Sequence, residues 1–228
     1  MTLYFPTELK ELICLFLKFE FVIHLSNYIS KKKYDEKRFD WDITATNGQF
    51  EIIKWLHIHR STDCSTAAMD LAAAYGHLEI VEFLHENRRE GCTYHAMDWA
   101  ADNGKLEVVK WLHENRSEGC SENALDYTTY YGNIEIVKFL HTFRTEGCNT
   151  TSMNNAANGH LEVVQFLNTF RTEGCTTLAL NSAATQGHLE VVIFLHKILS
   201  LDCSTWWVID CTEYNGHLEV VEYLKNIK

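Results

Sequence analysis

The sequence predicts an all-α fold, a solenoid of stacked helix pairs preceded by an N-terminal helical segment, and three observations predict it. A block of the form G-(H/K/N/Q)-(L/I/F)-E-(V/I)-(V/I)-x-(F/W/Y)-L occurs seven times. Its copies start 27–29 residues apart, a period typical of units that stack on one another. Six copies then reach a cysteine 16 residues after the glycine. The glycines are Gly48, Gly76, Gly104, Gly132, Gly159, Gly187 and Gly216, and the cysteines are Cys64, Cys92, Cys120, Cys148, Cys175 and Cys203.

The block itself is predicted to be the second helix of each unit. In the third copy, Leu106, Val109 and Leu112 are spaced three residues apart, as the apolar stripe of a helix requires. Glu107 falls in the first turn, where the positive end of the helix dipole favours a carboxylate.

The segment before each glycine is predicted to be the first helix of the unit. In the third unit it contains the pair Ala100-Ala101, which lets a neighbouring helix approach closely, and it ends at Asn103-Gly104, which suits a left-handed cap. The residue after each repeated cysteine is of a type that caps a helix N-terminus. These residues are Ser65, Thr93, Ser121, Asn149, Thr176 and Ser204. We therefore divide the chain into an N-terminal segment, residues 1–38, and a solenoid of seven helix pairs, residues 39–228.

Composition and charge narrow the classes of function. The 228 residues include 20 Lys and Arg against 31 Asp and Glu, a formal net charge of −11. Phosphate binding depends on clustered basic residues, so we expect no nucleic-acid partner and favour a neutral or basic protein. The apolar stretch at 12–25 is too short for a membrane span and is interrupted by Lys18, Glu20 and His24. We expect an intracellular, cytoplasmic monomer that does not contact a membrane.

Eight cysteines and twelve histidines raise the question of a metal or redox site. The cysteines recur once per unit, and stacked helices lie about 8–10 Å apart, whereas a disulfide needs Cα atoms within about 7 Å. The sequence contains no C-x2-C or H-x3-H pair of the kind that holds zinc. We interpret the repeated cysteines as small core thiols in a reducing compartment, and we expect no metal and no cofactor.

The histidines also recur at fixed places in the unit. A catalytic histidine needs one special neighbourhood, and these share the same neighbourhood several times. We interpret the first group as turn-capping side chains and the second as basic groups near a helix C-terminus, and we expect no enzyme. The first group is His77, His160, His188 and His217, and the second is His57, His85, His113, His141 and His196.

The repeated unit resembles the ankyrin repeat. The run at 72–84, A-A-A-Y-G-H-L-E-I-V-E-F-L, is similar to the family's A-A-x-x-G-H-x-x-V-V-x-x-L-L core, and Glu-Gly-Cys at 90–92, 118–120, 146–148 and 173–175 is similar to the glycine-alanine that ends its second helix. Two features depart from the family. Ala-Met-Asp at 96–98 replaces the T-P-L-H box, and the period is about five residues short of 33. The resemblance implies helix pairs whose β-hairpin fingers are shortened or lost.

The resemblance also implies where a protein partner binds. In ankyrin repeats, the position before the alanine pair and the two positions after it line the concave surface. Tyrosine and tryptophan dominate the energetics of protein interfaces. An alternative is that Trp99 and Tyr127 pack between repeats. The positions matched here are Tyr75, Trp99, Asp102, Asn103, Tyr127, Tyr130, Tyr131, Gln186 and Tyr214.

Residues 5–17, F-P-T-E-L-K-E-L-I-C-L-F-L, resemble the opening of an F-box, L-P-x-E-(L/V)-x-x-x-I-x-x-x-L. The resemblance implies that Pro6, Leu9, Ile13 and Leu17 contact the adaptor of a cullin-type ubiquitin ligase. The other interpretation is an amphipathic helix that covers the open end of the solenoid, as terminal repeats require. Both interpretations stay open. We expect a protein-binding module that either recruits a ligase substrate or acts as a scaffold or inhibitor without ligase contact.

Overall fold

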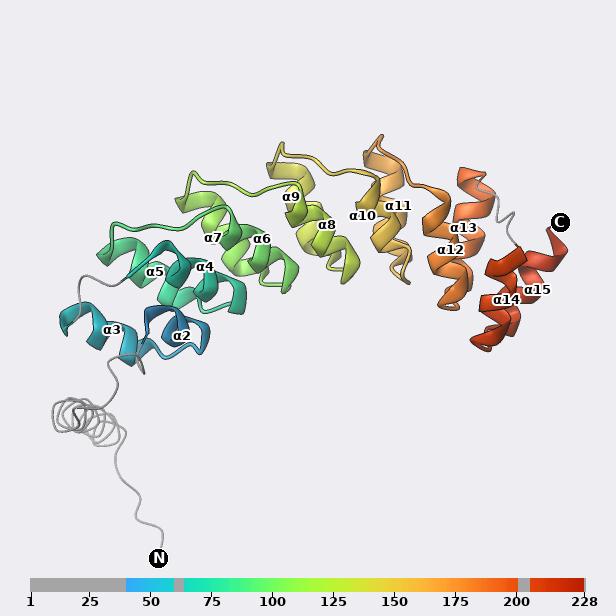
Figure 1. The fold of residues 1–228 in the computed structure, drawn as a ribbon. Helices are drawn as coiled ribbons and strands as arrows, with labels where there is room; N and C mark the ends of the chain where they lie inside the picture. Colours follow the sequence, from blue (N-terminus) through green and yellow to red (C-terminus); the bar gives the residue numbers. More distant parts are fainter. Residues whose placement is uncertain (1–39, 60–63, 201–205, 228) are drawn as a thin grey trace, which may run out of the picture.

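The computed structural model describes residues 40–59, 64–200 and 206–227, which form fourteen α-helices and no β-strand (Figure 1). The first helices of the seven pairs, here called the inner helices, are α2 (Trp41–Thr46), α4 (Thr66–Tyr75), α6 (His95–Asp102), α8 (Asn123–Tyr130), α10 (Thr150–Ala156), α12 (Thr177–Thr185) and α14 (Trp206–Tyr214). The outer helices are α3 (Phe50–His59), α5 (Leu78–Asn87), α7 (Leu106–Asn115), α9 (Ile134–Phe143), α11 (Leu161–Phe170), α13 (Leu189–Leu199) and α15 (Leu218–Asn226). The predictions for Pro6, Leu9, Ile13 and Leu17 lie outside the described residues.

The seven pairs stack side by side into an arc (Figure 1). Successive inner helices pack closely, whereas successive outer helices are farther apart, so the inner helices line the concave side. The loops that join one pair to the next contain no strand within the described residues, as the short period predicts. The all-α helix-pair solenoid is therefore confirmed.

One continuous core runs through the stack between inner and outer helices. The first six units contribute one or more alanines from the inner helix, the seventh contributes Val208 and Ile209, and every unit adds a Val/Ile/Leu stripe from its outer helix. In the third unit Val108, Val109 and Leu112 are buried, and Leu106 and Trp111 pack against them half-buried. The stripe that periodicity predicts is therefore the core side of the outer helix.

The cap residues act as predicted and also join neighbouring units. The side chains of Ser65, Asn149 and Thr176 accept hydrogen bonds from the backbone N–H two residues on, and Thr93 and Ser121 do the same at the start of α6 and α8. Each of these five residues also bonds to the preceding unit, at the residue that stands in place of the histidine of the T-P-L-H box. The longest of these bonds, from the Ser65 hydroxyl to Asp42, measures 3.5 Å. The pairs are Asp42–Ser65, Asp70–Thr93, Asp98–Ser121, Asp126–Asn149 and Asn154–Thr176.

The turn-capping prediction holds for His77 and His160, although the turn that each caps belongs to the preceding unit. His77 and His160 make no cap bond to their own helices, and each lies over the glycine of the preceding unit. Their Nε2 atoms donate to the carbonyls of Thr46 and Tyr130, both at 3.0 Å, because a carbonyl oxygen only accepts. These imidazoles therefore satisfy carbonyls at the C-terminal ends of the preceding inner helices.

The second group of histidines forms contacts between outer helices. Each ring meets an aromatic ring of the next unit edge-on, and the His85–Trp111 centroids, for example, lie 5.2 Å apart at 86°. This arrangement suits aromatic quadrupoles, so these side chains contribute packing between units. The pairs are His57–Phe83, His85–Trp111, His113–Phe139, His141–Phe166 and His196–Tyr223.

The loops between pairs are braced by ion pairs within the R-x-E-G-C run. Arg116 pairs with Glu118 in the same loop, and its guanidinium lies over Gly91 of the preceding loop. Gly91 has φ +71°, and a Cβ there would meet the Arg116 Nη2 atom at 2.5 Å, so any other residue would strain the backbone and displace the guanidinium. Equivalent pairs join Arg88 to Glu90, Arg144 to Glu146 and Arg171 to Glu173.

The repeated cysteines lie beside these loops as free thiols. Cys92 is buried, and Cys64, Cys120, Cys148 and Cys175 are half-buried against the core, so the core-thiol interpretation holds fully for one and partly for four. Burial, reinforced by a nearby glutamate, raises the pKa of Cys64 and Cys92 to about 11 and that of Cys120 to about 12. Such thiols are protonated at neutral pH. Cys203 lies outside the described residues.

Candidate protein-binding surface

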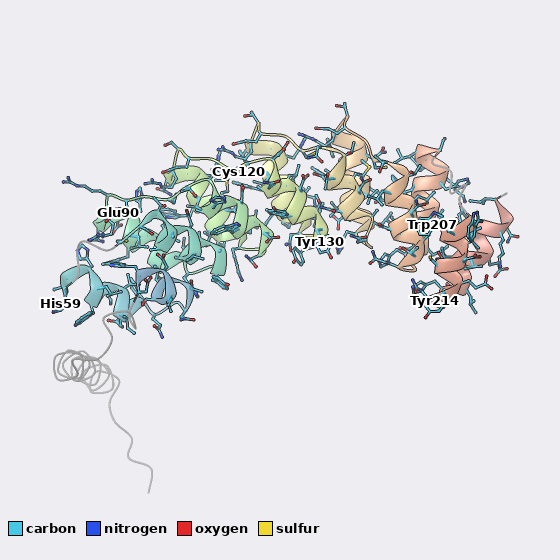
Figure 2. All side chains as sticks on the ribbon, in the orientation of Figure 1. His59, Glu90, Cys120, Tyr130, Trp207 and Tyr214 are labelled. Carbon is cyan, nitrogen blue, oxygen red and sulfur yellow. The ribbon has the colours of Figure 1, made fainter. Side chains whose placement is uncertain are left out.

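The concave side exposes aromatic side chains from the middle of the solenoid. Tyr75 on α4, Tyr127 and Tyr130 on α8, and Tyr131 directly after α8 are 43–60% exposed. Tyr214 on α14 is 92% exposed, toward the end of the arc. Figure 2 shows Tyr130 and Tyr214 on the lower, concave edge of the solenoid.

Trp99 is half-buried and stacks on a residue of its own helix. Its ring stacks on His95 one turn earlier in α6, at 4.8 Å and 22°, and His95 in turn contacts Tyr94 at 4.2 Å. At the end of α8 the rings of Tyr130 and Tyr131 meet edge-on at 5.1 Å. Both ring contacts lie within one unit, and Tyr127 is exposed. Packing between repeats stays the alternative prediction for Trp99 and Tyr127.

None of these exposed tyrosines donates or accepts a hydrogen bond through its hydroxyl within the described residues. The only tyrosine hydroxyl bonded there is that of Tyr223, on α15, which lies 3.0 Å from Nδ1 of His196. A tyrosine offers an apolar ring and a polar tip at a small cost in side-chain entropy, so such residues suit a binding surface. The set is Tyr75, Tyr94, Tyr127, Tyr130, Tyr131 and Tyr214.

Two of the predicted polar residues serve the solenoid itself. The Asn103 side-chain amide donates to the Trp99 carbonyl at 2.9 Å, and the Gln186 amide donates to Asn158 of the preceding unit at 2.8 Å. Asp102 differs, because it is half-buried and makes no hydrogen bond or ion pair with any described residue. Partial burial raises the pKa of its carboxyl above the ordinary value of 3.8.

We define the central aromatic surface as Tyr75, Tyr94, Trp99, Asp102, Glu122, Tyr127, Tyr130 and Tyr131. Sequence reasoning missed Tyr94 and Glu122, which lie at the start of α6 and α8, equivalent to each other in consecutive units. The family positions taken from the resemblance begin at the residue before the alanine pair and leave these places out. The signal that would have found them is that this repeat position holds tyrosine in the third unit and glutamate in the fourth. Positions that build the stack vary less from one unit to the next.

The geometry agrees with comparison to known families. A sequence model described as Ankyrin repeats (3 copies) matches residues 42–126 and 97–175, which together make up more than half of the chain. This chain belongs to the ankyrin-repeat family. No curated protein matches it significantly. In this family member the histidine of the T-P-L-H box is replaced by a residue, usually aspartate, that binds the next unit.

Ankyrin repeats act generally as protein-interaction modules, and three further findings describe this one. No group of three or more His, Cys, Asp or Glu side chains in the described residues is arranged to hold a metal ion. None of the helices described combines the length and apolar character of a membrane span. The seven inner helices contain no Lys or Arg, although they contain seven Asp and Glu residues, namely Asp42, Asp70, Asp98, Asp102, Asp126, Asp210 and Glu213.

Proposed function

We propose that this ankyrin-repeat protein binds another protein through the central aromatic surface of its concave side. The observation that carries the proposal is the concentration of exposed tyrosines directly before α6, on α8 and directly after α8. Their hydroxyls have no partner in the described chain. Large aromatic side chains are the commonest energetic anchors of interfaces. The framework residues of the same units are used in packing, so the variable concave positions are free for recognition.

Binding and mutagenesis test this proposal. The full chain and two variants are used as bait in cell extract, and captured proteins are identified by mass spectrometry. Tyr127→Ala/Tyr131→Ala should lose the specific partner. Phe143→Ala/Phe170→Ala is the matched control, because these aromatic side chains are 54% and 58% exposed but lie at the C-terminal ends of the outer helices α9 and α11. Loss with the control and retention with the concave variant would overturn the proposal.

We infer further that the N-terminal segment links this binding to ubiquitination. The support is the F-box-like opening at residues 5–17, with Pro6, Leu9, Ile13 and Leu17 at the family's positions. In this account the solenoid holds a substrate while the segment contacts the adaptor of a cullin-type ligase. The competing account is a scaffold or inhibitor whose N-terminal segment covers the first repeat.

Deleting residues 1–34 separates these two accounts. If the segment binds the adaptor, the truncated protein keeps its fold and its concave-face partner but no longer co-purifies with ligase subunits. If the segment is a cap, truncation lowers the melting temperature, and the full chain retrieves no adaptor. A full chain that fails to retrieve the adaptor from cells where other F-box proteins succeed would contradict the ligase account.

A further inference from the structure

We propose that the partner segment on the central aromatic surface is basic and extended, with a Lys or Arg side chain that pairs with Asp102. This inference rests on the proposed function and specifies the chemistry of the partner. Three features of the concave side support it: the distribution of charge, the environment of Asp102, and the spacing of aromatic rings along the stack.

The inner helices of the described chain contain no Lys or Arg. The described basic residues lie on outer helices and connecting loops. Several of them are already paired on the outer helices, as Lys54 is with Glu51, and Lys110 with Glu107. Three of the inner-helix carboxyls, those of Asp70, Asp98 and Asp126, are buried and bonded to the next unit. Asp102 and Glu122 are then the negative groups that the central aromatic surface offers to a basic segment, in a chain with a formal charge of −11.

Asp102 is the carboxylate best placed to receive a cation. It is partly removed from water, which raises its pKa, and it has no partner among the described residues. The nearest basic residue along the chain is Lys105. Its aliphatic stem lies over Gly76, and its ammonium group makes no ion pair with Asp102. An ammonium or guanidinium group of the partner would replace the interactions with water that the Asp102 carboxylate loses on partial burial. An apolar partner would bury this carboxylate and offer no interaction in return.

Aromatic rings flank Asp102 at the same level of the stack. Asp102 and Asn103 occupy the positions that Tyr130 and Tyr131 occupy in the next unit, and Tyr75 occupies the second of them in the preceding unit. All three tyrosines are exposed. A Lys or Arg side chain reaching Asp102 therefore passes between rings whose faces attract cations. This combination favours a basic side chain over a neutral polar one.

The spacing of the units favours an extended segment. Packed helices lie about 8–10 Å apart, and an extended chain advances roughly 3.3 Å per residue, so residues three apart reach consecutive inner helices. A partner residue opposite Asp102 on α6 would have neighbours three positions away opposite Tyr75 and Tyr130. We therefore expect a basic residue flanked at this interval by aliphatic or aromatic residues.

Selection from a random-peptide library displayed on phage tests the inference, with the full chain as bait. Selected peptides should be enriched in Lys or Arg, with apolar residues three positions away. Synthetic copies are then titrated by fluorescence polarisation against the full chain and two charge-matched variants. Asp102→Asn/Glu122→Gln removes two concave carboxylates. Glu79→Gln/Glu190→Gln removes two exposed carboxylates from the outer helices α5 and α13, so net charge changes equally.

The expected result is that the concave variant binds selected peptides about tenfold or more weakly, while the outer variant binds like the wild type. Equal weakening in both variants would show attraction by net charge alone and overturn the inference. Selected peptides that lack basic residues, yet lose binding to Tyr127→Ala/Tyr131→Ala, would overturn it while leaving the proposed function intact. Peptides that bind this tyrosine variant normally would count against the proposed function itself.

Discussion

The Asp98 carboxylate accepts two hydrogen bonds from Ser121, one from its backbone N–H at 2.8 Å and one from its hydroxyl at 2.5 Å. Asp98 belongs to α6, and Ser121 begins the next unit, 23 residues on, where its hydroxyl also caps α8. One residue pair therefore fixes both the start of a helix and its position against the preceding unit. The same pairing recurs along the stack, so it determines how the units are joined.

Replacing Asp98 tests this role. Asp98→Ala leaves the buried polar groups of Ser121 without their acceptor and should lower the free energy of unfolding by about 1–3 kcal/mol. Asp98→Asn should stay within about 1 kcal/mol of the wild type, because Asn154 accepts from the Thr176 N–H at 3.0 Å in the fifth unit. Urea unfolding measures both variants. Equal destabilisation by Asn and Ala would contradict the hydrogen-bond account.

Stability should depend on pH through two opposing groups of carboxyls. Burial raises the pKa of Asp98 above 3.8, although its bonds from Ser121 partly offset the rise. Its contribution to stability is therefore complete below pH 3.8 and is lost as pH rises through the folded-state pKa. For Glu118, burial alone would raise the pKa, but hydrogen bonds from Arg116 and the backbone outweigh it and lower the pKa below 4.5. Its contribution is present above pH 4.5 and is lost as pH falls through the folded-state pKa.

Urea midpoints measured across the acid range separate these contributions. As pH rises from below 3.8 through the folded-state pKa of Asp98, the stability of Asp98→Asn should increase relative to that of the wild type. As pH rises to above 4.5, the stability of Glu118→Gln should decrease relative to that of the wild type. The two variants are matched, because each replaces one carboxylate by its amide. Parallel curves for both variants would contradict the assigned directions of the pKa shifts.

Sequence reasoning predicted the helices well because their signals are local. The glycine, the first-turn glutamate and the apolar stripe of 104–112 each act within one helix and recur seven times. It identified the aspartate of 96–98 only as a departure from the family, because the partner Ser121 lies 23 residues away in another unit. The same limit explains why the sequence does not show which turn His77 caps, since its partner carbonyl belongs to Thr46 of the preceding unit. Contacts between units leave a periodic mark in the sequence but do not show which atoms meet.

A mid-stack core substitution should uncouple the two halves of the solenoid. Leu112 is 1% exposed, and Leu112→Ala should cost about 2–5 kcal/mol. Because each unit contacts only its neighbours, the loss should broaden the thermal transition or split it in two. Glu114→Ala, at an exposed position of the same helix, should change stability by less than about 0.5 kcal/mol. A sharp, unshifted transition for Leu112→Ala would contradict this account of the stack.

The repeated thiols should be slow to react in the folded protein. With its pKa raised to about 12, Cys120 holds little thiolate at neutral pH, and Cys92 is also buried. A thiol reagent should therefore modify both far more slowly in the native state than in denaturant, as peptide mass spectrometry would show. Cys211, which is half-buried on α14, serves as the internal comparison for the buried Cys92. Rapid native modification of Cys120 would contradict its assignment as a structural thiol.

Hydrogen–deuterium exchange of the full chain with its captured partner tests the central claim most directly. If the partner lies on the central aromatic surface, amide exchange should slow in residues 94–103 and 122–131, which include α6 and α8, and should change little in the outer helices α9 and α11. Slowed exchange confined to the outer helices, with 94–103 and 122–131 unchanged, would contradict it.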